Sequence, residues 1–132
     1  MQTKHIFAIV IASGFSLLGC DEKTTSEGDT IVCTAVIAPA LQVSVFDKET
    51  GFPNACGATV IFEDGDFYEE HIYEQNESCN ESYTFSGADE REGIYNVTVK
   101  KEGYMEWQQF DVEVSSNLCH VNTISLQAYL EK

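Results

Sequence analysis

The chain has 132 residues and carries 22 acidic residues against seven basic ones, which gives a formal net charge of −15 at pH 7. This length suits one domain with a modest core. The charge excludes nucleic-acid binding, because phosphate recognition needs clusters of Lys and Arg, and the only adjacent basic pair is Lys100-Lys101. Anionic membrane surfaces would also repel the domain, so the charge favours either simple solubility or a cationic partner.

Residues 1–19 have the pattern of a signal peptide. Lys4 and His5 form a short, weakly basic start, and residues 6–18 are a mostly apolar run of thirteen residues. Such a run is too short to span about 30 Å of hydrocarbon as a helix, but it suits a cleaved leader. The predicted domain therefore excludes residues 1–19.

The end of this run, Leu17-Leu18-Gly19-Cys20, resembles the lipobox of bacterial lipoproteins. The resemblance implies that Cys20 becomes the first residue of the mature protein and carries a diacyl or triacyl lipid. More than one acyl chain gives stable anchoring. The implied location is the bacterial cell envelope, facing the periplasm, with the membrane as a partner through Cys20. The alternatives are an ordinary signal peptide with a chance cysteine, or a buried helix.

The residues after the cysteine bear on the membrane and on the tether. Asp21 resembles the inner-membrane retention signal of enterobacterial lipoproteins, which favours the inner membrane and leaves the outer one open. Residues 20–30 contain no large apolar side chain and predict the lipid anchor with a flexible tether. Residues 31–132 are the predicted domain.

Four cysteines remain in that domain: Cys33, Cys56, Cys79 and Cys119. An even number in a secreted domain predicts two disulfides, and three pairings are open. There is no C-x-x-C pair, and the spacings of 23, 23 and 40 do not resemble those of a zinc module. We therefore predict disulfides rather than a metal site.

From residue 30 onward, alternating apolar and polar side chains predict β-strands rather than helices. The expected strands lie near residues 41–45, 58–62, 67–73, 83–86, 95–100, 110–114 and 124–130. Residues 63–66 predict a tight hairpin turn, and 67–73 an edge or half-exposed strand. In the sixth strand, Phe110, Val112 and Val114 alternate with polar residues and are expected on one face. Seven short strands with turns between them indicate an all-β, seven-stranded antiparallel β-sandwich.

Two segments refine this prediction. The first strand ends at Asp47 and is followed by Thr50-Gly51-Phe52-Pro53; later come Gly93-Ile94-Tyr95-Asn96-Val97-Thr98-Val99 and Gly103-Tyr104. Together they resemble the carboxypeptidase regulatory-like and transthyretin group over roughly residues 40–130. The resemblance implies a sandwich with Tyr95 packed inward and its hydroxyl at the rim. It implies no specific function, because these sandwiches serve as stalks, carriers, appendages and occasional enzymes.

The enzymatic relative in that group is 5-hydroxyisourate hydrolase, which uses histidines on its first and last strands, an arginine and a C-terminal Y-R-G-S. Here the first histidine position holds Ser44, and the last falls near Thr123, three residues from His120. Arg91 is the only arginine, and the chain ends at residues 128–132 without Y-R-G-S. We therefore predict no catalytic residues, and keep a hydrolase only as a remote alternative.

Other chemical groups are sparse. His71 and His120 are the only histidines after the leader, and a zinc site usually needs three or four ligands. The acidic run around Gly65 lacks the length and the closing Glu of an EF-hand loop, and it predicts a turn. We predict no metal and no cofactor.

Aromatic residues are the remaining candidates for recognition. The candidate recognition surface is Tyr68, Tyr73, Tyr104 and Trp107, which flank strands rich in polar residues. Such rings can stack on a sugar or anchor a protein, although a small domain needs most of its aromatics for the core. We predict a non-catalytic binding or scaffolding domain with an envelope protein partner. The alternative is a sugar- or peptide-binding module.

Overall fold

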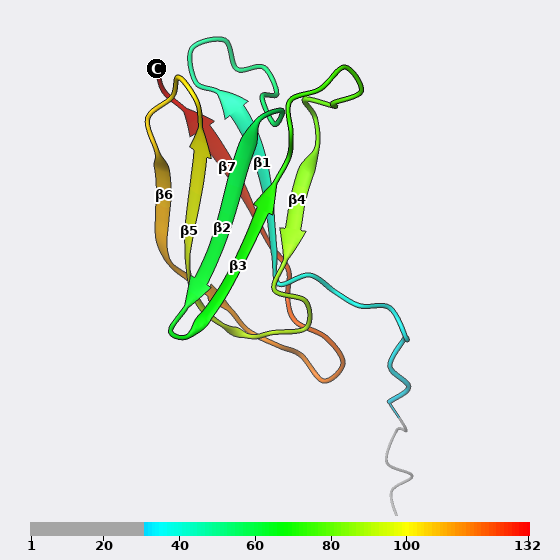
Figure 1. The fold of residues 1–132 in the computed structure, drawn as a ribbon. Helices are drawn as coiled ribbons and strands as arrows, with labels where there is room; N and C mark the ends of the chain where they lie inside the picture. Colours follow the sequence, from blue (N-terminus) through cyan, green and yellow to red (C-terminus); the bar gives the residue numbers. More distant parts are fainter. Residues whose placement is uncertain (1–30) are drawn as a thin grey trace, which may run out of the picture. The chain divides into compact units, whose positions relative to one another are not determined.

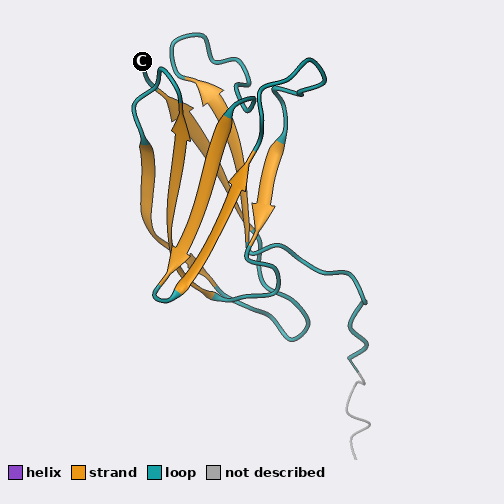
Figure 2. Cartoon of the chain, in the orientation of Figure 1, coloured by secondary structure: helices purple, strands orange, loops and turns teal. Residues whose placement is uncertain are grey.

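The computed structural model describes residues 31–132. The predicted signal peptide, the lipid attachment at Cys20 and the tether at 20–30 lie outside the described residues. Within residues 31–132 the chain forms seven strands and no helix (Figures 1 and 2).

Each predicted strand is present, with boundaries close to those expected. The strands are β1 (Leu41–Asp47), β2 (Ala58–Asp64), β3 (Phe67–Ile72), β4 (Thr84–Gly87), β5 (Gly93–Lys101), β6 (Trp107–Val114) and β7 (Ile124–Leu130). They form a three-stranded sheet of order β4-β1-β7 and a four-stranded sheet of order β3-β2-β5-β6. The all-β prediction is confirmed, and two sheets over one core are the arrangement of a β-sandwich.

The prediction of a wholly antiparallel sandwich is wrong at one pairing. β1 and β7 are parallel, from Leu41 opposite Ile124 to Asp47 opposite Leu130. Every connection in this chain reverses direction, so the first and seventh strands run the same way (Figure 1). Placing them side by side therefore makes a parallel pair. The alternation of apolar and polar residues predicts which face of the sheet a side chain occupies. It does not predict which strand pairs with the strand that carries that side chain.

The core lies between the two sheets. Its largest fully buried side chains are Tyr95, Phe62 and Phe85, one from each of β5, β2 and β4. The Tyr95 hydroxyl donates to the carbonyl of Arg91 at 2.7 Å and accepts from Arg91 Nη1 at 3.0 Å. The inward position of this ring is as expected, and its one polar atom is satisfied, as a buried hydroxyl requires.

β6 departs from the predicted alternation. Phe110 is 59% exposed, whereas Val112 and Val114 are buried. The pairing register shifts between Tyr95 and Val97 on the partner strand, and Asp111 has a φ of +55°. This β-bulge moves Phe110 off the inward face, because one extra residue inverts the alternation.

The two ends of the sandwich are built from different connections (Figure 1). The β2–β3, β4–β5 and β6–β7 connections lie at the end where the chain enters β1, which we call the entry end. The β1–β2, β3–β4 and β5–β6 connections lie with the C-terminus at the opposite end, which we call the C-terminal end.

Candidate functional site

Both predicted disulfides are present, and the structure selects one of the three possible pairings. Cys33 is bonded to Cys119, and Cys56 to Cys79. The first joins the segment before β1 to the β6–β7 connection, across a sequence separation of 86 residues. The second joins the β1–β2 connection to the β3–β4 connection. Each bond therefore fixes one end of the sandwich.

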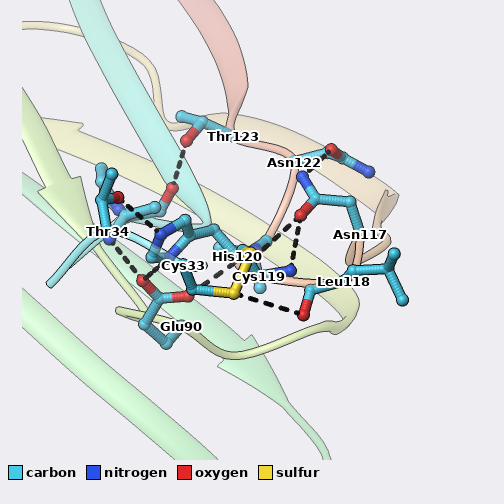
Figure 3. Close-up of polar contacts among 12 residues, drawn as sticks. Cys33, Thr34, Glu90, Asn117, Leu118, Cys119, His120, Asn122 and Thr123 are labelled. Atoms are coloured by element: carbon cyan, nitrogen blue, oxygen red, sulfur yellow. Dashed lines mark hydrogen bonds and ion pairs between the residues drawn. A yellow bond between two sulfur atoms is a disulfide. The ribbon is translucent and has the colours of Figure 1, made fainter. Parts of the chain in front are cut away.

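A group of side chains around Cys33–Cys119 fixes the chain before β1 to the entry end, and we call it the N-terminal clamp: Cys33, Thr34, Glu90, Cys119 and His120 (Figure 3). Thr34 Oγ1 lies 3.0 Å from His120 Nε2. On the other side of the ring, His120 Nδ1 lies 2.7 Å from Glu90 Oε1. The clamp thus joins three separate segments of the chain through one imidazole.

The Glu90 carboxylate also holds the backbone that leads into β1. Its Oε1 accepts a hydrogen bond from the amide of Ala38 at 2.7 Å, and the amide of Glu90 donates to the carbonyl of Ala38 at 2.9 Å. These contacts lower the pKa of Glu90, the Ala38 amide having the largest effect and His120 the next. Glu90 is therefore an ionised acceptor that ties the segment before β1 to the β4–β5 connection.

The order hydroxyl, imidazole, carboxylate in the clamp is that of a nucleophile, its base and the group that orients the base. Catalysis also requires a cleft that holds a substrate against the hydroxyl. None of the four main cavities in the described residues is lined by Thr34, Glu90 or His120. The geometry accounts for attachment of the N-terminal segment, and sequence reasoning did not anticipate it.

A second polar cluster lies at the C-terminal end around Asp47. The Tyr104 hydroxyl donates to Asp47 Oδ2 at 2.7 Å, while the amides of Glu49 and Thr50 donate to Oδ1 at 2.9 and 3.0 Å. Lys132 Nζ lies 3.4 Å from Oδ2. The pKa of Asp47 is held well below 3.8, chiefly by the Tyr104 hydroxyl and then by the Thr50 amide. An open cavity of about 380 Å³ adjoins this cluster.

We expect Asp47→Asn to remove a pH-dependent part of the stability. Because folding lowers the pKa of Asp47, its contribution is complete above the unfolded pKa near 3.8 and is lost as the pH falls through the lower folded value. The stability gap between wild type and variant should therefore narrow as the pH is lowered from 6 towards 2. Urea unfolding at each pH measures it, with Glu102→Gln as the control for loss of one exposed charge. A stability difference between wild type and variant that does not change with pH would contradict a lowered pKa of Asp47 in the folded protein.

The structure does not bring the four aromatic residues of the candidate recognition surface together. Tyr68 is 58% exposed on β3 and donates to Glu70 Oε2 at 2.9 Å. Tyr73, Tyr104 and Trp107 are partly buried against the core. Their role in binding stays a prediction, and Tyr68 alone stands clear of the core.

The two histidines are both paired with glutamates. His71 Nε2 lies 2.5 Å from Glu69 Oε1, and Glu69 Oε2 accepts from the amide of Ala88 at 2.9 Å.

The predicted turn at 63–66 joins β2 to β3. Residues 31–132 contain no group of three His, Cys, Asp or Glu side chains arranged to hold a metal ion.

Comparison of the chain with protein-family models, with curated proteins and with solved structures gives no match. Within the part of the chain that the structure describes, we find no helix with the length and apolar character needed to cross a membrane.

Proposed function

We propose that this protein is a bacterial envelope lipoprotein, anchored through Cys20, whose sandwich is a non-catalytic binding or scaffolding domain of the carboxypeptidase regulatory-like or transthyretin-like type. The observation that carries the proposal is the segment Leu17-Leu18-Gly19-Cys20 directly after the apolar run 6–18. The proposed partner is an envelope protein that the anchored domain reaches from the membrane.

Two features of the described residues support this proposal. Two disulfides suit an oxidising compartment such as the periplasm. The N-terminal clamp fixes residue 33 at the entry end, so any pull from an anchor at Cys20 acts on a covalently closed point and not on β1 itself. The intervening residues reach at most about 45 Å, at 3.3–3.6 Å per residue, which would keep the domain close to its membrane.

We expect Cys20→Ala to release the protein from the membrane fraction and to abolish incorporation of radioactive palmitate. Loss of the cysteine removes the only site for the acyl chains, and the acidic domain has no attraction of its own for an anionic surface. Cell fractionation and lipid labelling measure both effects.

Asp21→Asn is the matched control, since it changes the neighbouring residue and keeps the cysteine. This variant should remain lipidated and membrane-bound, and density-gradient separation of the membranes would show whether Asp21 holds it in the inner one. A Cys20→Ala protein that still sediments with membranes and still carries palmitate would overturn the anchoring proposal.

A further inference from the structure

The outer face of the three-stranded sheet has an unusual composition for so acidic a protein. On β1 the buried side chains alternate with Gln42, Ser44 and Phe46, which point away from the core. On β4 the outward side chains are Thr84 and Ser86. Each of these five side chains is uncharged, and Ser44 Oγ lies 3.1 Å from Thr84 Oγ1 on the neighbouring strand.

β7 continues the same surface on the other side of β1. Its outward side chains are Ser125, Gln127 and Tyr129, which lie opposite the three outward residues of β1. The single charged residue in β1, β4 and β7 is Asp47, which is buried. We call the outward side chains of these three strands the uncharged face. By contrast, the outward residues of the four-stranded sheet include Glu63 and Glu70.

Aromatic rings lie at the C-terminal end of this face. Phe46 and Tyr129 are stacked across the parallel pair, with ring centroids 5.1 Å apart and planes inclined by 22°. Tyr129 remains 44% exposed. A small hollow of about 70 Å³ beside Phe46 is also lined by Pro53, Tyr83 and Glu81, so one carboxylate residue borders this end of the face. The face therefore combines rings with a row of hydroxyl and amide groups.

We infer that the uncharged face binds a neutral polysaccharide. A sugar ring offers apolar C–H faces that pack on aromatic rings, and a rim of hydroxyls that both donate and accept hydrogen bonds. Ser, Thr and Gln likewise both donate and accept, so they match that rim in either direction. Uncharged groups also lose less solvation free energy on binding than carboxylates or ammonium groups.

The charge distribution favours this occupant over others. The net charge of −15 repels polyanions, including anionic polysaccharides and a second copy of the chain. A strongly cationic partner would find carboxylates on the four-stranded sheet and none on the uncharged face. Residues 42–46 extend about 13 Å along β1, and the three strands together are about 10 Å wide. This area has room for a short stretch of a glycan chain. The inference rests on the proposed binding role and not on the lipid anchor.

Native affinity electrophoresis tests the inference, because the acidic protein migrates readily. The full-length protein, purified in a polyoxyethylene detergent that contains no sugar, is run through gels containing dextran, laminarin, galactomannan or, as the anionic probe, alginate. We expect retardation by at least one neutral polysaccharide and none by alginate. Retardation by no neutral polysaccharide in this set, or by alginate alone, would overturn the inference.

Two matched variants locate the site. Gln127→Glu introduces one charge into the uncharged face and keeps an acceptor for the Tyr129 hydroxyl, which donates to Gln127 Oε1 at 3.2 Å. Gln109→Glu makes the same change at an exposed position on β6. We expect the first to weaken binding at least about tenfold and the second to leave it unchanged. Equal effects of the two variants would overturn the location of the site.

The outcomes separate this inference from the proposed function. One outcome is that no neutral polysaccharide retards the protein, while a dimer or a complex with a protein partner forms and is lost in Gln127→Glu. This outcome overturns the glycan inference and leaves the proposal of an anchored binding domain in place. Failure of the Cys20→Ala fractionation overturns the anchor and leaves the electrophoresis result standing.

Discussion

Replacing Cys33 and Cys119 together with alanine is expected to lower the free energy of unfolding by up to about 4.6 kcal/mol. The bond closes a loop with a sequence separation of 86 residues, and this loop contains β1 to β6. In the chain-entropy model, a loop of this length strongly restricts the unfolded chain, so removing the bond stabilises the unfolded state. The native clamp also loses its covalent link, which leaves the hydrogen bonds of Thr34 and Glu90 to hold the segment before β1.

Urea unfolding followed by tryptophan fluorescence measures this loss, because Trp107 is the single tryptophan and begins β6 against the core. Thr34→Ala is the local control, since it removes one exposed hydrogen bond of the same clamp and should cost less than about 1 kcal/mol. If the double cysteine variant loses no more stability than this control, the clamp does not constrain the unfolded chain.

The strands were predictable because alternation is a local property. In β1 and β7 every second side chain is buried, as the sequence pattern indicates. The parallel pairing of these two strands was not predictable, because it depends on which strands become neighbours across most of the chain length. The exposure of Phe110 was missed for a different reason: a bulge depends on the partner strand, and the alternation in β6 alone carries no sign of it.

The candidate sites were likewise predictable from the sequence only in part. The presence of disulfides follows from the even number of cysteines, but their pairing requires the fold. His120 and Glu90 are 30 residues apart in the sequence, and no motif connects them; the proximity of His120 to Cys119 is the one signal available. The uncharged face is visible in the sequence as Gln, Ser and Thr at alternate positions. Its extent appears only when β4 and β7 are placed on either side of β1.

Aromatic residues were the least informative signal. Tyr73 stacks on Tyr83 with ring centroids 4.2 Å apart, and Tyr104 is engaged by Asp47. Charged neighbours in the sequence therefore do not predict that an aromatic ring is exposed, because in a small domain such rings also cover the ends of the core. Tyr129, which the sequence places among apolar strand residues, is exposed on an outer face, as are Tyr68 and Phe110.

Gly87→Ala is expected to destabilise the fold by about 2–3 kcal/mol. Gly87 ends β4 at a buried position opposite Leu41. A β-carbon there would lie 2.5 Å from Glu69 Oε1, 2.7 Å from Phe62 Cε2 and 2.8 Å from His71 Nε2. All three separations are far below van der Waals contact, so at least three side chains must move.

Each of these movements destabilises the folded protein. Phe62 is fully buried in the core, and displacing its ring disturbs the packing between the sheets. Moving Glu69 weakens its bonds to His71 and to the amide of Ala88. Because one methyl group opposes all of these contacts at once, the overpacking cost exceeds the gain of up to about 1 kcal/mol from stiffening the unfolded chain.

Ser86→Ala provides the control, because it creates an alanine one residue away on the outer face by removing only an exposed hydroxyl, and a change of about 0.5 kcal/mol or less is expected there. Phe62→Leu shortens the core side chain that the new methyl group meets, so the cost of Gly87→Ala should be smaller in that background, and a double-mutant cycle measures the difference. Equal costs of Gly87→Ala in both backgrounds would show that the ring of Phe62 is not what the glycine accommodates, and would assign the close approach to Glu69 and His71 alone.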